Sequence, residues 1–117
     1  MIRLELPEPP SLANKRWHWA ERNRRKNAYQ HDAYYMALDQ QKPPKPPPEK
    51  VRIRAHLRLW NLRDEDNLDA SLKWPLDALE GAYYVDDSPR HLEIVEVTQE
   101  IDRKNRGLTL EIEVVEP

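Results

Sequence analysis

Cysteine is absent from the 117 residues of this sequence, and glycine occurs only twice. Without cysteine the protein has no disulfide framework, no cysteine-ligated zinc or iron–sulfur cluster and no thiol nucleophile. With two glycines it has no glycine-rich loop of the kind that cradles phosphates. Carboxylates that bind a metal ion are therefore the enzymatic mechanism that this composition supports most readily.

Long apolar runs are also missing. No stretch approaches the roughly 20 apolar residues of a membrane span, and the first ten residues, MIRLELPEPP, contain no signal-peptide core. Hydrophobic residues make up 38% of the chain and charged residues 34%, and the mean hydropathy is −0.97. We therefore expect a cytoplasmic, intracellular protein without a membrane partner, folded as a single domain over residues 1–117 around one thin core.

The formal net charge of −2 hides a division along the chain. Residues 1–60 contain 13 Lys+Arg and 6 Asp+Glu, a charge of +7, whereas residues 61–117 contain 6 Lys+Arg and 15 Asp+Glu, a charge of −9. The two halves could pair with each other across a sheet. Alternatively, the first half could form a basic surface for a polyanion beside an acidic pocket for a cation.

Apolar residues alternate with polar ones over four segments, which is the period of a β-strand with one buried face. Two further segments have apolar residues at helical spacing. The expected fold class is α+β, a single β-α-β-α-β-β domain with a mixed sheet and helices packed on it. The predicted strands cover residues 2–6, 51–60, 92–101 and 108–114, and the predicted helices cover residues 28–41 and 66–80.

Charge and proline mark the segments between these elements. The basic residues 11–27 are expected to form an exposed loop or arm, and residues 42–50 a Pro-rich connector. Pro75 should either kink the second helix or begin a new first turn. Residues 92–101 are apolar on parts of both faces, so we place that strand at the centre of the sheet, and a hairpin turn at residues 105–107 should connect it to the last strand.

Acidic residues gather after the clearest strand and again after the second predicted helix. Asp64 and Asp66 point to the same side of an extended chain, and Asp87 belongs to an acidic pair that follows the helix. If the loop after the helix folds back, the three carboxylates come together. Three such carboxylates form a site for Mg²⁺ or Mn²⁺, and a metal ion there would activate water for phosphodiester cleavage.

These residues also have structural interpretations. Asp66 could cap the N-terminus of the helix, with Asp69 three residues later, and residues 86–89 could form a tight turn. Lys73 could neutralise a scissile phosphate, or it could form an ion pair within the helix with Asp69 or Asp77. The spacing leaves both interpretations open.

The basic segment is a candidate surface for nucleic acid. Its cations would contact phosphates, and the affinity would then depend strongly on salt. Trp17 and Trp19 within it could stack on unpaired bases or pack against the sheet. The arginines of the strand at 51–60 are instead expected to pair across the sheet with Glu111 and Glu113. The cations expected to contact phosphates are Lys15, Arg16, Arg22, Arg24, Arg25 and Lys26.

Four motifs, taken together, resemble the RusA-type Holliday-junction resolvases. They are LPEPPSLANKR near the start, RDEDNL at 63–68, LKWPLDALEG at 72–81 and YVDDSPRHLEI at 84–94. The resemblance implies a homodimeric, Mg²⁺-dependent endodeoxyribonuclease that resolves four-way DNA junctions by paired symmetric nicks, in DNA recombination and repair. Small resolvases of this type often occur in phages and prophages. A dimer fits this activity, because two identical sites related by a two-fold axis match the symmetry of the junction.

The resemblance also implies roles for particular residues. Asp64 and Asp66 match the two aspartates of D-x-D-N, and Asp87 matches the second aspartate of the D-D pair, so these three would be the metal-binding, catalytic carboxylates. Lys73 matches the essential lysine ahead of D-A-L, although it lies further from D-x-D-N-L than in the family's pattern. Arg63 matches the basic residue before the first aspartate and is expected to contact DNA.

Two other functions are compatible with the same residues. One is a non-catalytic nucleic-acid-binding module on the same fold, in which the acidic residues are helix caps. The other is a nuclease for other branched or flap DNA. The first predicts binding without cleavage under any divalent metal, and the second predicts a different preference among branched substrates.

Overall fold

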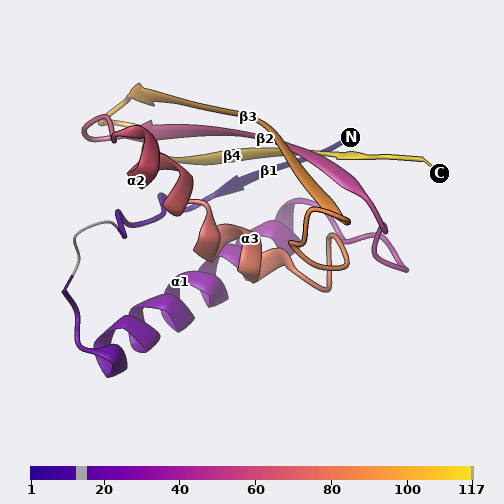
Figure 1. Cartoon of the computed structure of the whole chain (residues 1–117), viewed down its shortest axis with the longest axis horizontal. Coiled ribbons are helices and arrows are strands. Elements are labelled where there is room, and N and C mark those ends of the chain that lie inside the picture. The colour runs from indigo at the N-terminus through magenta and orange to yellow at the C-terminus, as the bar shows by residue number, and fades with distance from the viewer. Residues whose placement is uncertain (13–15, 117) are drawn as a thin grey trace.

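A computed structural model describes residues 1–12 and 16–116. It shows a mixed four-stranded sheet with strand order β1-β4-β2-β3 and helices packed on one face (Figure 1). The predicted α+β class and element order are confirmed, with the second predicted helix divided in two. The strands are β1 (Ile2–Leu6), β2 (Val51–Leu59), β3 (Leu92–Ile101) and β4 (Gly107–Val114), and the helices are α1 (Trp19–Gln40), α2 (Glu65–Ala70) and α3 (Lys73–Leu79).

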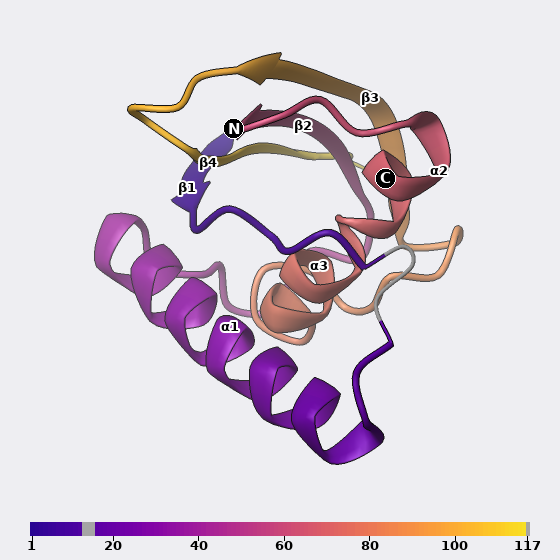
Figure 2. The same cartoon turned by 90° about the vertical axis from the view of Figure 1, so that its left-hand side faces the viewer.

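Helix α1 is the longest element, and its N-terminal end extends beyond the sheet (Figure 2). The prediction that residues 11–27 form a loop or arm is wrong from Trp19 onward, because α1 begins there rather than at residue 28. The first turns contain charge and no apolar stripe, so periodicity does not reveal them. They are supported locally, because the Nε of Arg25 donates to Glu21 at 3.0 Å and the His18 ring accepts a hydrogen bond from the backbone of Ala20.

The core lies between the sheet and the layer formed by α1 and α3. Helix α1 buries Ala33 and Ala37 against it. The apolar face of β2 is buried along its whole length, as the alternation predicts. No helix among the described residues is both long and apolar enough to cross a membrane.

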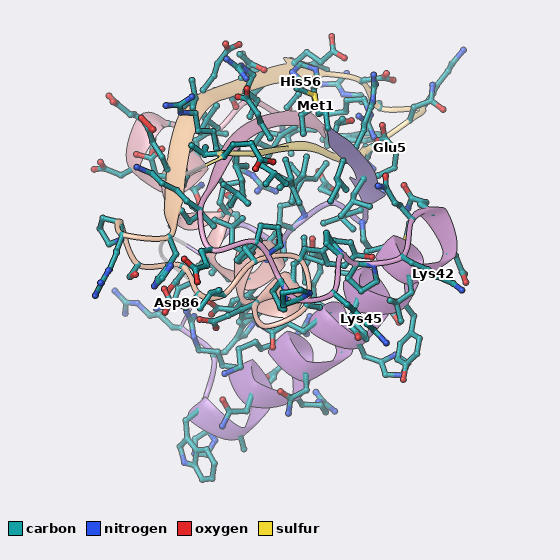
Figure 3. The ribbon with its side chains drawn as sticks, turned by 90° about the vertical axis from the view of Figure 1, so that its right-hand side faces the viewer. Met1, Glu5, Lys42, Lys45, His56 and Asp86 are labelled. Carbon is teal, nitrogen blue, oxygen red and sulfur yellow. The ribbon has the colours of Figure 1, made fainter. Side chains whose placement is uncertain are left out.

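The other face of β2 is polar, and none of the described helices covers it. Figure 3 shows His56 on this side of the molecule, away from α1. The arginines of β2 pair across the sheet as expected, but Glu113 is their only predicted partner within ion-pair distance among the described residues. The pairs are Arg52–Glu93 at 3.4 Å, Arg54–Glu113 at 4.0 Å and Arg58–Glu5 at 3.0 Å.

Strand β3 lies at an edge of the sheet, so its predicted central position is wrong. It pairs in parallel with β2, and its Ile94 and Val95 remain 44% and 42% exposed. Strand β4 takes the interior position between β1 and β2, and its Leu108, Leu110 and Ile112 are fully buried. Residues 105–107 therefore lead the chain past the end of β2 and do not form the predicted hairpin turn.

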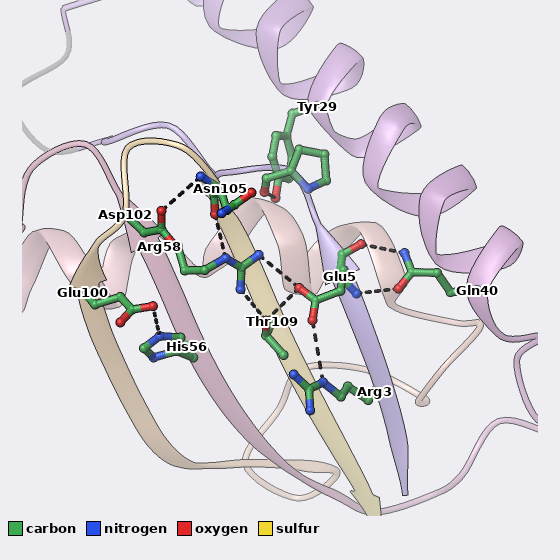
Figure 4. A network of polar contacts seen from close by, with 11 residues as sticks. Arg3, Glu5, Tyr29, Gln40, His56, Arg58, Glu100, Asp102, Asn105 and Thr109 are labelled. Atoms are coloured by element: carbon green, nitrogen blue, oxygen red, sulfur yellow. Dashed lines mark hydrogen bonds and ion pairs between the residues drawn. The ribbon is translucent and has the colours of Figure 1, made fainter.

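Gly107 stands where the chain enters β4, in a close approach of three segments. A Cβ added there would lie 2.7 Å from Nη2 of Arg58 and 3.1 Å from the carbonyl oxygen of Leu6. The Arg58 guanidinium is held in place because it donates to the carbonyl of Asn105 at 2.7 Å and to Glu5 at 3.0 Å (Figure 4). A side chain at this position would therefore displace an arginine that joins β2 to β1.

Gly107→Ala is expected to lower the free energy of unfolding by about 1–2 kcal/mol, because overpacking outweighs the entropy that alanine removes from the unfolded chain. Urea denaturation of the variant and of Lys104→Ala, an exposed neighbour, measures the effect. A Gly107→Ala midpoint equal to that of the wild type would contradict this account of the close approach.

The second predicted helix is two helices, α2 and α3, that meet at Ser71 and Leu72. Pro75 lies in the first turn of α3, which confirms the alternative that it begins a new turn. Because proline has no N–H, Pro75 leaves the carbonyl of Ser71 without a helical hydrogen-bond partner. The Ser71 hydroxyl donates a hydrogen bond to the backbone carbonyl of Asn67 at 2.7 Å. Gly81, with φ of +86°, follows the end of α3, as expected for a C-terminal glycine.

Candidate functional site

The first acidic pair lies at the N-terminus of α2, where the chain leaves β2. Asp64, rather than Asp66, is the N-cap residue, and its Oδ1 accepts a hydrogen bond from the backbone N–H of Asn67 at 2.8 Å. Asp66 lies in the first turn and is exposed, and no ion pair joins it to another residue of the described chain. Its carboxylate is therefore available to a ligand.

Arg63 lies just before this pair and is largely buried, with 11% of its side chain exposed. Its guanidinium donates to the hydroxyl of Ser71 at 2.7 Å and to the carbonyl of Pro9 at 2.8 Å, and it lies 3.9 Å from Glu8. Burial lowers the pKa of Arg63, while Glu8 and Tyr29 oppose that change. The donors are used inside the protein, which favours a structural role over the predicted contact with DNA.

Residues 7–11 are bonded to the helices at several points. The hydroxyl of Ser11 donates to Oδ1 of Asn67 at 2.9 Å, and the hydroxyl of Tyr29 donates to the carbonyl of Pro7 at 2.8 Å. Burial raises the pKa of Tyr29, so its hydroxyl stays protonated and keeps this bond. Together with Arg63, these bonds connect α1 to α2 through the N-terminal segment.

A second charged group forms around Asp77 on α3. Burial raises the pKa of Asp77, and the negative charge of Asp87 raises it further, while Lys73 and Lys26 lower it. These four residues come from α3, the loop after it and α1. Lys73 is exposed and forms no direct ion pair within the described chain, so the expected intrahelical pair with Asp69 or Asp77 is not formed.

The loop after α3 holds Asp86 and Asp87 in different environments. Asp86 accepts a hydrogen bond from the backbone of Ser88 at 2.9 Å, which lowers the pKa of Asp86 and confirms the turn predicted there. Figure 3 labels Asp86 on this loop. Asp87 is exposed, and its carboxylate is not used by the turn.

The structure does not gather Asp64, Asp66 and Asp87 into one metal-binding group. No three His, Asp or Glu side chains in residues 1–12 and 16–116 lie close enough together to hold a metal ion. The expected single helix face is interrupted because α2 ends at Ala70. Asp87 lies with Asp77 instead.

The donor chemistry of the two acidic groups still fits a hard divalent cation. Mg²⁺ prefers oxygen ligands and is commonly held by one or two carboxylates together with waters and substrate phosphates, rather than by a complete protein cage. Asp64 and Asp66 supply two carboxylates at the start of α2, and Asp77 and Asp87 supply two more near the end of α3. Each pair includes an exposed carboxylate, at Asp66 and at Asp87.

The basic residues expected to contact phosphates lie on the first turns of α1 and just before it, except Lys15, which lies outside the described residues. Trp17 stacks on Trp74 of α3 with ring centroids 6.3 Å apart, so it packs on a helix and not on the sheet. Arg25 lies 4.8 Å from the Trp17 ring centroid and Arg22 lies 5.8 Å from that of Trp74. Stacking on these rings holds the two arginines beside α3.

The raised pKa of Asp77 predicts a pH-dependent effect of neutralising it. Ionisation of Asp77 costs more free energy in the folded than in the unfolded chain. The stability that the neutral acid contributes is therefore fully present below the pKa of the unfolded chain, and it is lost as the pH rises through the pKa of the folded chain. Asp77→Asn should therefore raise the melting temperature by about 1–3 °C at pH 7, a small shift because solvent screens the carboxyl, and have little effect at pH 3. Thermal unfolding at both pH values tests this, and a lower melting temperature at pH 7 would contradict it.

Asp77 is the site residue whose role is hardest to recognise from the sequence. Its only local signal is its position one helical turn after Lys73, which is equally typical of an intrahelical ion pair. Its proximity to Asp87 and Lys26 depends on how the loop and α1 pack on α3.

Comparison with known proteins adds no further guide, since neither a protein-family model nor a curated protein matches this chain.

Proposed function

We propose that this protein is a Mg²⁺-dependent endodeoxyribonuclease that acts on branched DNA, with the four-way junction as its substrate, in recombination and repair. The observation that carries the proposal is that Lys73 and Asp87 both lie near Asp77. They belong to separate motifs of the sequence, yet both act on the carboxyl group of Asp77. A lysine beside exposed carboxylates is suited to phosphodiester chemistry, because it can offset negative charge on the phosphate.

In this proposal Asp64, Asp66 and Asp87 provide the oxygen ligands for Mg²⁺, or for Mn²⁺ in its place, and binding of the metal ion or DNA has to bring Asp87 to the α2 pair. When bound, the metal ion would neutralise charge on the scissile phosphate and lower the pKa of a coordinated water. The ammonium group of Lys73 would stabilise the charge that develops on the phosphate oxygens. Asp64 also caps α2, because its Oδ1 accepts a hydrogen bond from the backbone of Asn67. Its other carboxylate oxygen is the one proposed to bind the metal ion.

The basic start of α1 would bind the DNA backbone. Arg24 has 76% of its side chain exposed. Lys26 lies close enough to Asp77 to lower the pKa of that carboxyl group, so this surface adjoins the site. Phosphate contacts of this kind release counterions, so the affinity should fall steeply as salt increases. The described residues proposed for this role are Arg16, Arg22, Arg24, Arg25 and Lys26.

Paired nicking further requires two sites, and we therefore include a homodimer in the proposal. A two-fold axis would present two identical acidic sites to the two equivalent strands of a four-way junction. Sedimentation velocity of the protein at micromolar concentration measures this directly. A mass of one chain, both alone and with junction DNA, would contradict paired nicking by this protein.

The direct test is a cleavage assay on a panel of substrates. A labelled four-way junction, a flap, a fork and a linear duplex are incubated with the protein in Mg²⁺, in Mn²⁺ and in EDTA. The proposal expects metal-dependent nicks at symmetric positions in the junction and little cleavage of the duplex. Preferential cleavage of the flap or fork would favour the nuclease for other branched DNA.

A second candidate is a binding module without catalysis. It is favoured by the role of Asp64 as a helix cap and by the separation of Asp87 from the α2 pair. It expects binding of branched DNA in the same panel, with no cleavage under any divalent metal. The two candidates share the basic surface of α1 and differ only in the acidic groups.

A further inference from the structure

Trp19 is the most exposed tryptophan among the described residues and stands at the projecting end of α1. Its residue surface is 71% exposed, whereas Trp74 is buried and Trp17 stacks on it. Figure 2 shows this end of the helix extending beyond the rest of the fold. The exposed indole ring presents apolar surface that a partner from outside the chain would bury favourably.

The charge around Trp19 indicates what kind of partner that is. Five cations lie in residues 16–26, and the single acid there, Glu21, is bound to Arg25 by two hydrogen bonds of 3.0 and 2.9 Å. An apolar protein surface or a membrane core would leave these cations without counter-charges. A nucleic acid offers both phosphates for the cations and flat aromatic faces for the indole ring.

The backbone position of Trp19 is fixed by the fold. Trp19 is the first residue of α1, and the ring of His18, which caps that helix, lies 5.7 Å from the indole centroid. The other end of α1 is anchored, because Ala33 and Ala37 are buried in the core. The helix therefore holds Trp19 at a set distance from Lys26, which lies further along the same helix and next to Asp77.

We propose that Trp19 stacks on an unpaired nucleobase where strands of branched DNA separate. This inference rests on the proposed function for its choice of DNA. Paired bases inside a duplex show only their edges, so a face for stacking exists only at a branch point, an end or a single-stranded stretch. Trp19 would thus select branched or unpaired DNA over duplex, while the neighbouring cations bind both.

The test measures binding without cleavage. Fluorescence anisotropy in EDTA compares two labelled DNAs of equal length, a duplex and a fork with single-stranded thymine arms. Trp19→Ala is expected to weaken binding to the fork about 10-fold and to leave duplex binding within about 2-fold. Trp19→Phe, which keeps an aromatic ring, should recover most of the affinity for the fork. Circular dichroism confirms that the exposed position tolerates each change.

The matched control is Arg24→Ala, five residues along the same helix. Loss of a phosphate contact should weaken binding to both DNAs by a similar factor. An equal effect of Trp19→Ala on fork and duplex, or no effect on either, would overturn the stacking proposal. So would sedimentation showing that Trp19→Ala dissociates a dimer, because Trp19 would then be covered by a second copy of the chain.

The outcome is independent of whether the protein is a nuclease. A wild type that prefers the fork in EDTA but cleaves no substrate in Mg²⁺ would refute the proposed catalysis and leave the role of Trp19 supported. A wild type that cleaves the junction, with a Trp19→Ala variant that binds fork and duplex unchanged, would refute the role of Trp19 alone.

Discussion

Replacing Asp66 with Asn is expected to lower the rate of Mg²⁺-dependent nicking of a four-way junction by at least about 100-fold, which is typical of removing one electrostatic group from a catalytic site. The amide keeps the shape of the carboxylate but removes its charge, so it is a weak ligand for Mg²⁺. Stability should change little, because Asp66 is exposed and lies in the first turn of α2, where the helix dipole contributes only about 0.3–1 kcal/mol.

The matched control for this prediction is Asp69→Asn. Asp69 is also exposed and also lies on α2, but it lines a groove together with Ile94 and Val97 of β3. It should keep the wild-type rate. Single-turnover nicking is measured over a range of Mg²⁺ concentrations, with junction binding measured in EDTA. Wild-type nicking by Asp66→Asn would exclude this residue from the metal site and would favour the binding module.

Asp87→Asn extends the same test to the second acidic group. Asp87 lies with Asp77 rather than with Asp64 and Asp66, so its contribution decides whether the two groups work on one substrate. A loss comparable to that of Asp66→Asn would mean that DNA or metal binding brings the groups together. Normal activity would place the chemistry at the N-terminus of α2 alone.

The parts of the fold that the sequence predicts correctly are those with a clear local period. The strict alternation of Val51–Leu59 sets one apolar face on the core, and the structure agrees with it along the whole strand. The start of α1 has no such period, since its first turns are held by charge pairs and by a cap. The order of the strands is not a local property at all. A turn-like segment at 105–107 indicates a change of direction, but only burial of β4 decides which neighbours it takes.

The same distinction applies to the candidate site. The motifs correctly predict an aspartate cap where the second helix begins, although the cap is Asp64 and not Asp66, because capping depends on near neighbours. They place Lys73 inside one helix, whereas it begins α3. They fail to show that a break at Ser71 separates the two acidic groups. They also fail to show that Arg63 is buried, because two of the groups that it binds, Pro9 and Glu8, come from the distant N-terminal segment. Tertiary contacts of that kind leave no local signal.

Arg63→Ala is therefore expected to act mainly on stability, lowering the free energy of unfolding by about 2–4 kcal/mol. The variant removes two hydrogen bonds from a charged group, each worth about 1.5–3 kcal/mol, partly offset by the cost of burying the guanidinium. It also releases the N-terminal segment at Pro9 from α2. Arg63→Lys should recover only part of the loss, because an ammonium group does not reproduce the planar fork that spans Ser71 and Pro9. Urea denaturation measures all three proteins.

Salt dependence separates this structural role from a contact with DNA. If Arg63 touched a phosphate, Arg63→Ala would reduce the slope of log affinity against log salt by about one, as is expected for the exposed Arg24→Ala. Because the guanidinium of Arg63 is occupied by Ser71, Pro9 and Glu8, we expect its slope to equal that of the wild type at a temperature where the variant remains folded. A reduced slope with unchanged stability would show that Arg63 leaves these partners to bind DNA, as the resemblance to the resolvases implies.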